Sequence, residues 1–190
     1  MVHVVILAGG KSSRFKKNKM ETLFLGKPIL QHTIESFINL SNHIVVVTGF
    51  YSVDYLKAFI EDHNITVVHN EKHEKGMFSS VLKGVSKVEN NFLLTPGDYP
   101  NISEKTIQTL LNGEGSVRVP TYKGRKGHPI YIDSCLLDEL KNEDIDSNLK
   151  VFRDKHNVSY IEVDDEGILQ DVDYLEDLQT IEKRLSEHDF

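Results

Sequence analysis

The sequence of 190 residues contains no tryptophan, five prolines and a single cysteine, Cys135. One cysteine cannot form a disulfide within the chain, so a disulfide framework is excluded and a reducing compartment is expected. No run of apolar residues approaches the roughly 18 that span a membrane. No charged segment followed by an apolar stretch opens the sequence, so we predict no targeting segment. We therefore expect a cytoplasmic protein without a membrane partner.

Positive charge is also scarce, with 22 Lys and Arg against 29 Asp and Glu and a formal net charge of −7. Nucleic acids and anionic membrane surfaces are bound through broad basic faces, so we expect no nucleic-acid partner. Basic residues form an obvious cluster between Arg14 and Lys19. A site for an anion is therefore expected to be local.

Short apolar runs alternate with amphipathic segments along the first part of the chain. Runs rich in Val, Ile and Leu predict buried strands at residues 2–7, 43–48, 65–69 and 91–95. Apolar spacings of three and four predict helices at 29–40, 53–62, 79–88 and 103–111, the last with Ser103 as its N-cap. This alternation predicts an α/β fold of three α/β/α layers around a Rossmann-like, mostly parallel sheet.

The pattern changes after residue 115. Residues 116–121 and 128–132 predict two strands joined by a basic loop at 122–127. Helices near 134–141 and 148–155, a strand near 159–163 and a last helix around 175–187 follow. No repeat, low-complexity tract or linker interrupts the chain, so we expect a single domain over residues 1–190.

The most informative segment, LAGGKSSR at residues 7–14, directly follows the first predicted strand. Small residues leave backbone N–H groups free to face an anion, and mobile basic residues follow them. A Walker A loop needs a glycine where this chain has Val5, and a dinucleotide fingerprint needs a third glycine beyond Gly9 and Gly10. The segment is therefore either another kind of phosphate loop or an ordinary turn with surface lysines.

Two carboxylate segments could hold a metal ion. Asp98 follows the fourth predicted strand, and Asp171 and Asp173 precede the last helix, where an extended chain would point both to one side. Mg²⁺ prefers one or two carboxylates together with substrate phosphates. The alternatives are that Asp98 is a turn residue and that Asp173 is a helix N-cap, paired with Glu176 in a capping box.

Two further segments carry polar groups that could contact a ligand. Gly76, Ser79 and Ser80 open the third predicted helix and could contact a ribose or base, or cap the helix. The basic segment GRKGHP at 124–129 contains His128, which could bind an anionic second substrate or have a structural role. The other histidines lack the spacing of a zinc site, so we predict no zinc.

These segments, taken in order, resemble the motifs of the MobA-like nucleotidylyltransferases, which include molybdenum cofactor cytidylyl- and guanylyltransferases. The family's L-A-[AG]-G-x-S-x-R-[MF]-G-x-x-K motif is similar to residues 7–19, with Arg14 and Lys19 in register. Residues 76–80, 96–100, 127–129 and 171–178 resemble its G-M-x-x-S, strand-end acidic, G-H-P and D-x-D-T-P-E-D-L motifs. The chain departs from the family at Lys16, where a glycine is usual, and at Tyr174-Leu175, where Thr-Pro is usual.

The resemblance implies a fold of the nucleotide-diphospho-sugar transferase type and an Mg²⁺-dependent nucleotidyltransferase. Such an enzyme transfers NMP from an NTP to a phosphorylated acceptor such as molybdopterin cofactor and releases pyrophosphate. The motifs around residues 76–80 and 124–129 favour CTP, whereas Gly10 is typical of the guanylyl branch, so the base stays open. A molybdoenzyme or its maturation factor would be a protein partner.

The roles that the resemblance implies fall into four groups. The catalytic residues would be Arg14, Lys19 and Asp98. The nucleotide would be bound by Leu7, Ala8, Gly9, Gly10, Arg14, Lys19, Gly76, Ser79 and Ser80. The acceptor would meet Arg125, Gly127 and His128, and the metal ion would be held by Asp98 and Asp173. Two alternatives stay open: a sugar- or polyol-phosphate nucleotidylyltransferase, and a non-catalytic nucleotide-binding module in cofactor maturation.

Overall fold

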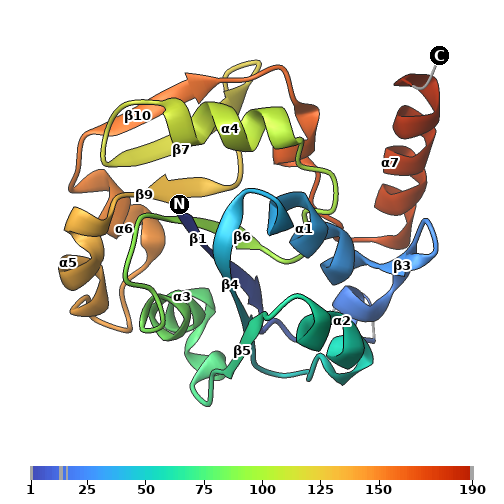
Figure 1. Cartoon of the computed structure of the whole chain (residues 1–190), viewed down its shortest axis with the longest axis horizontal. Helices are drawn as coiled ribbons and strands as arrows, with labels where there is room; N and C mark the ends of the chain where they lie inside the picture. Colours follow the sequence, from blue (N-terminus) through green and yellow to red (C-terminus); the bar gives the residue numbers. More distant parts are fainter. Residues whose placement is uncertain (1, 13–14, 16, 189–190) are drawn as a thin grey trace.

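The computed structural model describes residues 2–12, 15 and 17–188, apart from the side chains at 175 and 184–188. Its central sheet of eight strands has the order β10-β7-β9-β6-β1-β4-β5, with β8 paired to β7 (Figure 1). The strands are β1 (Val2–Ala8), β4 (Ser41–Thr48), β5 (Thr66–His69), β6 (Phe92–Pro96), β7 (Val117–Tyr122), β8 (Arg125–Lys126), β9 (Ile130–Ile132) and β10 (Val158–Glu162).

The pairing within this sheet explains where a ligand can bind. Strand β1 runs parallel to both of its neighbours, β4 and β6, and β5 runs parallel to β4. Strand β9 runs antiparallel to β6 and β7, and β10 runs parallel to β7. The chain moves from β1 to one side of the sheet and later returns to its other side at β6. The strand order therefore reverses between β1 and β6.

Helices cover both faces of the sheet. One face carries α1 (Ile29–Ile38), α2 (Lys57–Asp62) and α4 (Glu104–Asn112), and the other carries α3 (Met77–Val85), α5 (Leu137–Lys141) and α6 (Leu149–Asp154). Successive β1 side chains point to opposite faces. Val4 therefore packs in one core cluster with Phe37, whereas Val5 packs in the other with Val81. The predicted three-layer α/β/α class is confirmed.

Several helices begin or end at positions that local chemistry explains. Ser103 caps α4 as predicted, because its Oγ accepts a hydrogen bond from the backbone N–H of Thr106 at 3.2 Å. Helix α3 begins at Met77, earlier than predicted, directly after Gly76 with its φ of +100°. Short 3₁₀ turns occur at η1 (Lys19–Glu21), η2 (Asp54–Leu56), η3 (His73–Lys75), η4 (Ser134–Leu136) and η5 (Glu166–Leu169). Within the described part of the chain, no helix is both long and apolar enough to cross a bilayer.

The last helix, α7 (Leu175–His188), lies beside the small hairpin of β2 (Leu23–Phe24) and β3 (Lys27–Pro28) (Figure 1). Phe24 of the hairpin and Leu178 of the helix belong to one buried apolar cluster, which also contains Val172. This cluster fixes the segment that precedes α7 against the body of the protein.

The capping box predicted at the start of α7 is corrected. The carboxylate of Asp177, rather than that of Glu176, accepts hydrogen bonds from the backbone N–H groups of Asp173 (2.8 Å) and Tyr174 (2.7 Å). The helix begins at Leu175, so Asp177 occupies its third position, from which a carboxylate can reach back to the preceding N–H groups. Tyr174, rather than Asp173, therefore occupies the N-cap position.

Candidate functional site

A cavity of about 690 Å³ lies where the strand order reverses, at the carboxyl ends of β1 and β6. Ligands of open α/β sheets bind at such switch points. Gly97 continues from β6 and donates its backbone N–H to the carbonyl of Leu7 at 2.9 Å, which holds the two strand ends together. The loop after β1 and the loop after β6 therefore face the same space.

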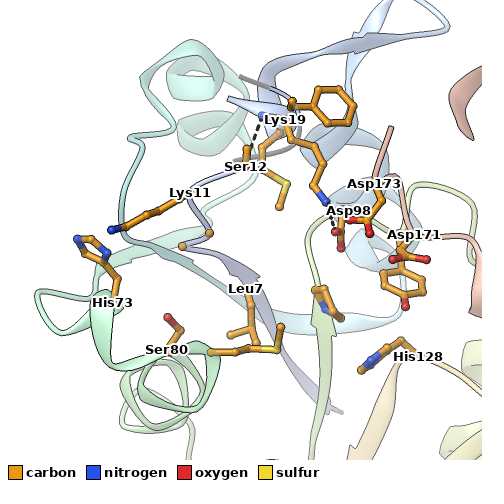
Figure 2. Close-up of a pocket in the computed structure, with 18 of the residues that line it drawn as sticks. Leu7, Lys11, Ser12, Lys19, His73, Ser80, Asp98, His128, Asp171 and Asp173 are labelled. Atoms are coloured by element: carbon orange, nitrogen blue, oxygen red, sulfur yellow. Dashed lines mark hydrogen bonds and ion pairs between the residues drawn. The ribbon is translucent and has the colours of Figure 1, made fainter. Parts of the chain in front are cut away.

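Lys19 joins two carboxylates at one end of the cavity (Figure 2). Its Nζ atom lies 2.6 Å from Oδ2 of Asp98 and 3.4 Å from Oδ1 of Asp173. The side chains of Lys19 and Asp98 are only 11% and 15% exposed, so water screens this pair little. The backbone N–H of Lys19 donates to Ser12 Oγ at 3.2 Å, which ties the first loop to this cluster.

The donor set at this end fits a divalent cation bound together with a ligand. The Oδ1 atom of Asp98 is buried and has no hydrogen-bond partner among the described residues. A cation, the Lys19 ammonium, already lies between the two carboxylates. No cluster of three or more metal-binding side chains occurs in the described part of the chain. The protein thus offers two carboxylates, and phosphate oxygens of a substrate would complete the shell that Mg²⁺ prefers.

Negative charge extends beyond this pair. Asp171 also lines the cavity, and partial burial together with the carboxylates of Asp98 and Asp173 raises its pKa. Burial and the same three carboxylates raise the pKa of the Tyr99 hydroxyl, which therefore stays protonated. This end of the cavity therefore needs more positive charge than Lys19 supplies, as a metal ion would provide.

His128 lines the cavity next to Tyr99, with the two ring centroids 5.1 Å apart. Its Nδ1 atom is buried and has no hydrogen-bond partner among the described residues. Desolvation lowers the pKa of His128 to about 4, although the carboxylate of Asp98 opposes this shift. The imidazole is therefore neutral at pH 7, and its unpaired Nδ1 can form a hydrogen bond with a ligand without adding charge.

The opposite end of the cavity is formed by the end of β1 and the start of α3, with Leu7, Gly9, Gly76 and Ser80 among its lining residues. Figure 2 shows Ser80, Lys11 and His73 on this side, away from Asp98 and His128. Gly49, which follows β4, packs so closely that a Cβ atom there would lie 2.7 Å from the carbonyl oxygen of Gly9. Phe50 also donates its N–H to that carbonyl at 3.2 Å. The strand ends thus hold the glycine loop in place.

Most of the predicted site residues meet in this one cavity, which is lined by Leu7, Gly9, Gly10, Lys19, Gly76, Ser80, Asp98, His128 and Asp173. Arg14 lies outside the described residues. Ala8 is a buried residue of β1, and the Ser79 hydroxyl is bonded within the protein rather than toward the cavity. Arg125 is exposed on β8, and Gly127 packs against the carbonyl of Ile168. Neither of these two lines the cavity.

The sequence did not assign a role to part of the lining, which also contains Lys11, Ser12, Phe15, Met20, His73, Glu74, Met77, Pro96 and Tyr99. Most of these residues lie next to a predicted motif in the sequence, so their place in the site could have been predicted from that position. For His73 and Glu74 the signal was absent, because they lie on a 3₁₀ turn that apolar periodicity does not predict. The hydrogen bond from the Lys19 backbone to Ser12 could not be predicted either. It depends on the left-handed backbone of Ser12, with a φ of 49°, which the residue pattern does not indicate.

A glycine loop, a lysine and two carboxylates thus meet at the switch point of an α/β sheet, where an anionic ligand and a metal ion could bind together. The family model of the MobA-like NTP transferase domain matches residues 4–159. The chain therefore belongs to this family and is a nucleotidyltransferase, as the motifs predicted.

Individual proteins show the same relationship. The chain is 26% identical over 190 residues to the molybdenum cofactor cytidylyltransferase of Escherichia coli K12, and the match covers 98% of both sequences. The structure superimposes on a nucleotidyl transferase from Methanothermobacter with a TM-score of 0.81, at 20% identity and 99% coverage of both chains. It also resembles Rv0371c of Mycobacterium tuberculosis H37Rv in complex with manganese, with a TM-score of 0.69, 17% identity and coverage of 95% and 97%. These two structures support the fold.

Proposed function

We propose that the protein transfers a nucleotidyl group from an NTP, with CTP favoured, to a phosphorylated acceptor such as molybdopterin cofactor and releases pyrophosphate. The observation that carries this proposal is the position of Lys19 between Asp98 and Asp173, facing the glycine loop across one cavity. The similarity to the cytidylyltransferase of Escherichia coli supports both the base and the acceptor.

The chemistry demanded of the protein is mainly electrostatic. Negative charge develops on the α-phosphate and on the leaving pyrophosphate, and the acceptor must be held in line with the bond that breaks. Lys19, together with Arg14 of the first loop, would contact these phosphates. The loop at Leu7–Gly10, with Gly76 and Ser80, would hold the nucleoside. An acceptor phosphate is already ionised at neutral pH, so a strong general base is not required.

We further propose Mg²⁺ as the metal ion, held by Asp98 and Asp173. It would neutralise phosphate charge and orient the α-phosphate toward the acceptor. The manganese complex of the mycobacterial structure supports a divalent cation in this fold, and Mn²⁺ accepts the same oxygen ligands as Mg²⁺. Because Lys19 Nζ contacts both carboxylates, a metal ion held by the same side chains would compete with it, and the triphosphate would offer its ammonium a new anionic partner.

The acceptor would bind on the side of His128, with Arg125 and Gly127 in the neighbouring segment. The neutral imidazole of His128 would give the acceptor a hydrogen-bond partner next to Tyr99. We place this activity in a single domain over residues 1–190 of a cytoplasmic protein. A molybdoenzyme or its maturation factor would receive the product.

The experiment is a pyrophosphate-release assay with purified protein, Mg²⁺, each of the four NTPs and molybdopterin as acceptor. We expect release with CTP, and we expect Asp98→Ala to abolish it without loss of the fold. Asp62→Ala on the exposed face of α2 is the control. Normal turnover by folded Asp98→Ala would contradict the metal assignment. NTP binding without Mg²⁺-dependent pyrophosphate release would indicate the non-catalytic module, and release with sugar phosphates would indicate the other class of transferase.

A further inference from the structure

A buried asparagine at the end of β5 contacts two serines of α3. The Nδ2 atom of Asn70 lies 2.8 Å from Ser79 Oγ and 3.0 Å from Ser80 Oγ. All three residues are at most 5% exposed. The backbone N–H of Asn70 donates to the carbonyl of Thr48 at 2.9 Å, so the residue is fixed to the neighbouring strand as well.

The direction of these hydrogen bonds follows from one backbone contact. The N–H of Lys72 can only donate, and it lies 3.0 Å from the side chain of Asn70, so the atom it meets is the carbonyl oxygen Oδ1. The amide nitrogen must then face the serines, and an amide nitrogen only donates. Each serine oxygen therefore accepts a hydrogen bond from Asn70.

The two serines differ in where their own protons go. Ser79 Oγ lies 2.7 Å from the carbonyl of Gly76 and 2.9 Å from that of Lys72, so its proton is used within the protein. Ser80 Oγ accepts from Asn70 but donates to no acceptor in the described part of the chain. Its proton is therefore available to a ligand.

The Ser80 hydroxyl is also accessible from the cavity, which Ser80 lines together with Leu7 (Figure 2). Gly9 lines the same part of the cavity. A Cβ atom at Gly9 would lie only 3.1 Å from Ser80 Oγ, so the missing side chain at Gly9 leaves this oxygen uncovered. Met77 adds a second apolar side chain to this end of the cavity. Leu7 and Met77 give this end two apolar side chains beside the Ser80 hydroxyl, which suits the flat face and polar edge of a nucleobase.

We propose that Asn70 is a positioning residue that makes the Ser80 hydroxyl a fixed hydrogen-bond donor to the nucleobase. The base atom that it meets must carry a lone pair and no proton, as a ring carbonyl oxygen or an unprotonated ring nitrogen does. An exocyclic amino group in the same place would meet a second donor and be disfavoured. The inference rests on the proposed nucleotide substrate. It adds that Asn70 orients the Ser80 hydroxyl for one hydrogen bond to the base.

The test replaces Asn70 by aspartate, which keeps the shape and the acceptor for Lys72 but removes the donor. The introduced carboxylate would accept a hydrogen bond from the Ser80 hydroxyl, so the hydroxyl could no longer donate to the base. We expect Asn70→Asp to raise the dissociation constant of Mg²⁺–CTP about tenfold, the scale of one hydrogen bond. KM should rise by the same factor with kcat little changed. Asn64→Asp, in the exposed turn after α2, is the matched control.

A second variant and a second probe separate positioning from a structural effect. Ser80→Ala should weaken CTP binding to a similar degree, with Ser86→Ala at the exposed end of α3 as its control. In the Ser80→Ala background, Asn70→Asp should weaken binding no further, because both changes remove the same donor. Inorganic tripolyphosphate with Mg²⁺, which has no base, should bind the wild type and both variants equally.

Each outcome has a definite meaning. Normal CTP binding by Ser80→Ala would overturn the inference, even if Asn70→Asp failed to fold. Equal losses for CTP and tripolyphosphate would also overturn it, since the effect would then not concern the base. If the wild type bound none of the four NTPs in calorimetry, the proposed function itself would fail, and that result is distinguishable from both others.

Discussion

The Nζ atom of Lys19 donates to Oδ2 of Asp98 at 2.6 Å, while Oδ1 of the same carboxylate is buried without a hydrogen-bond partner among the described residues. One oxygen of this carboxylate is thus bonded to Lys19, and the other oxygen is left for a ligand. The ammonium occupies a position that a divalent cation would compete for. This relationship leads to the first prediction.

Lys19→Ala should lower the rate of nucleotidyl transfer by roughly 10²-fold, the scale found when one donor to a transition-state charge is removed. Steady-state pyrophosphate release with saturating CTP measures it. Lys57→Ala, at the exposed start of α2, is the control and should retain the wild-type rate.

The same variant should bind Mn²⁺ more tightly than the wild type in the absence of nucleotide, because no ammonium competes for Asp98 and Asp173. Electron paramagnetic resonance of free Mn²⁺ reports this affinity. Weaker binding by Lys19→Ala would show that the lysine organises the carboxylates rather than competing for them.

Gly49→Ala should displace the first loop, because its Cβ atom would lie 2.7 Å from Gly9 O and 2.9 Å from Gly9 Cα. These are backbone atoms, so the loop itself must move. We expect the dissociation constant of CTP to rise at least about tenfold, with a loss of about 1–3 kcal/mol in the free energy of unfolding. Calorimetry and urea unfolding measure the two effects.

Gly84→Ala provides the contrast for Gly49→Ala. A Cβ atom there would meet the side chains of Val5 and Val47 in the core rather than the backbone of a loop. This variant should lose stability while its folded form binds CTP normally. If the two variants lost CTP affinity equally, the contact between Gly49 and Gly9 would not be what positions the loop.

His128→Asn should reduce the loss of stability on acidification. The pKa of His128 is about 4 in the folded protein, below its ordinary value of 6.5. Between these values the unfolded chain binds a proton that the folded protein does not, so stability falls as the pH decreases from 6.5 toward 4, by up to about 1.4 kcal/mol per pH unit. Urea unfolding at pH 7 and pH 5 should show a smaller difference in the variant. Equal differences in both proteins would contradict this assignment.

Much of the fold could be predicted because β1 and its neighbours are buried on both faces and read as continuous apolar runs. Element ends were less predictable. Helix α3 begins directly after Gly76, whose positive φ lets the chain turn. A glycine in the sequence does not by itself indicate whether a helix begins or ends beside it. The two-residue strand β8 is too short for any periodicity, so residues 122–127 were predicted as a loop.

The charged end of the site was predictable for a topological reason. Asp98 follows a parallel strand next to β1, so the switch-point rule brings it to the first loop. The end of the site near Ser80 was not predictable. Asn70 contributes there through the orientation of its side-chain amide, and Gly49 through its lack of a Cβ atom, which lets Gly9 pack against it. Neither property appears in a residue pattern. Both depend on which backbone group lies opposite.

The ion pair between Lys19 and Asp173 joins residues 154 positions apart, and Val172 beside Asp173 shares an apolar cluster with the β2–β3 hairpin and α7. During synthesis, the glycine loop and Asp98 would leave the ribosome long before the second carboxylate exists. A nascent chain therefore could not assemble its full complement of charged groups until α7 docked.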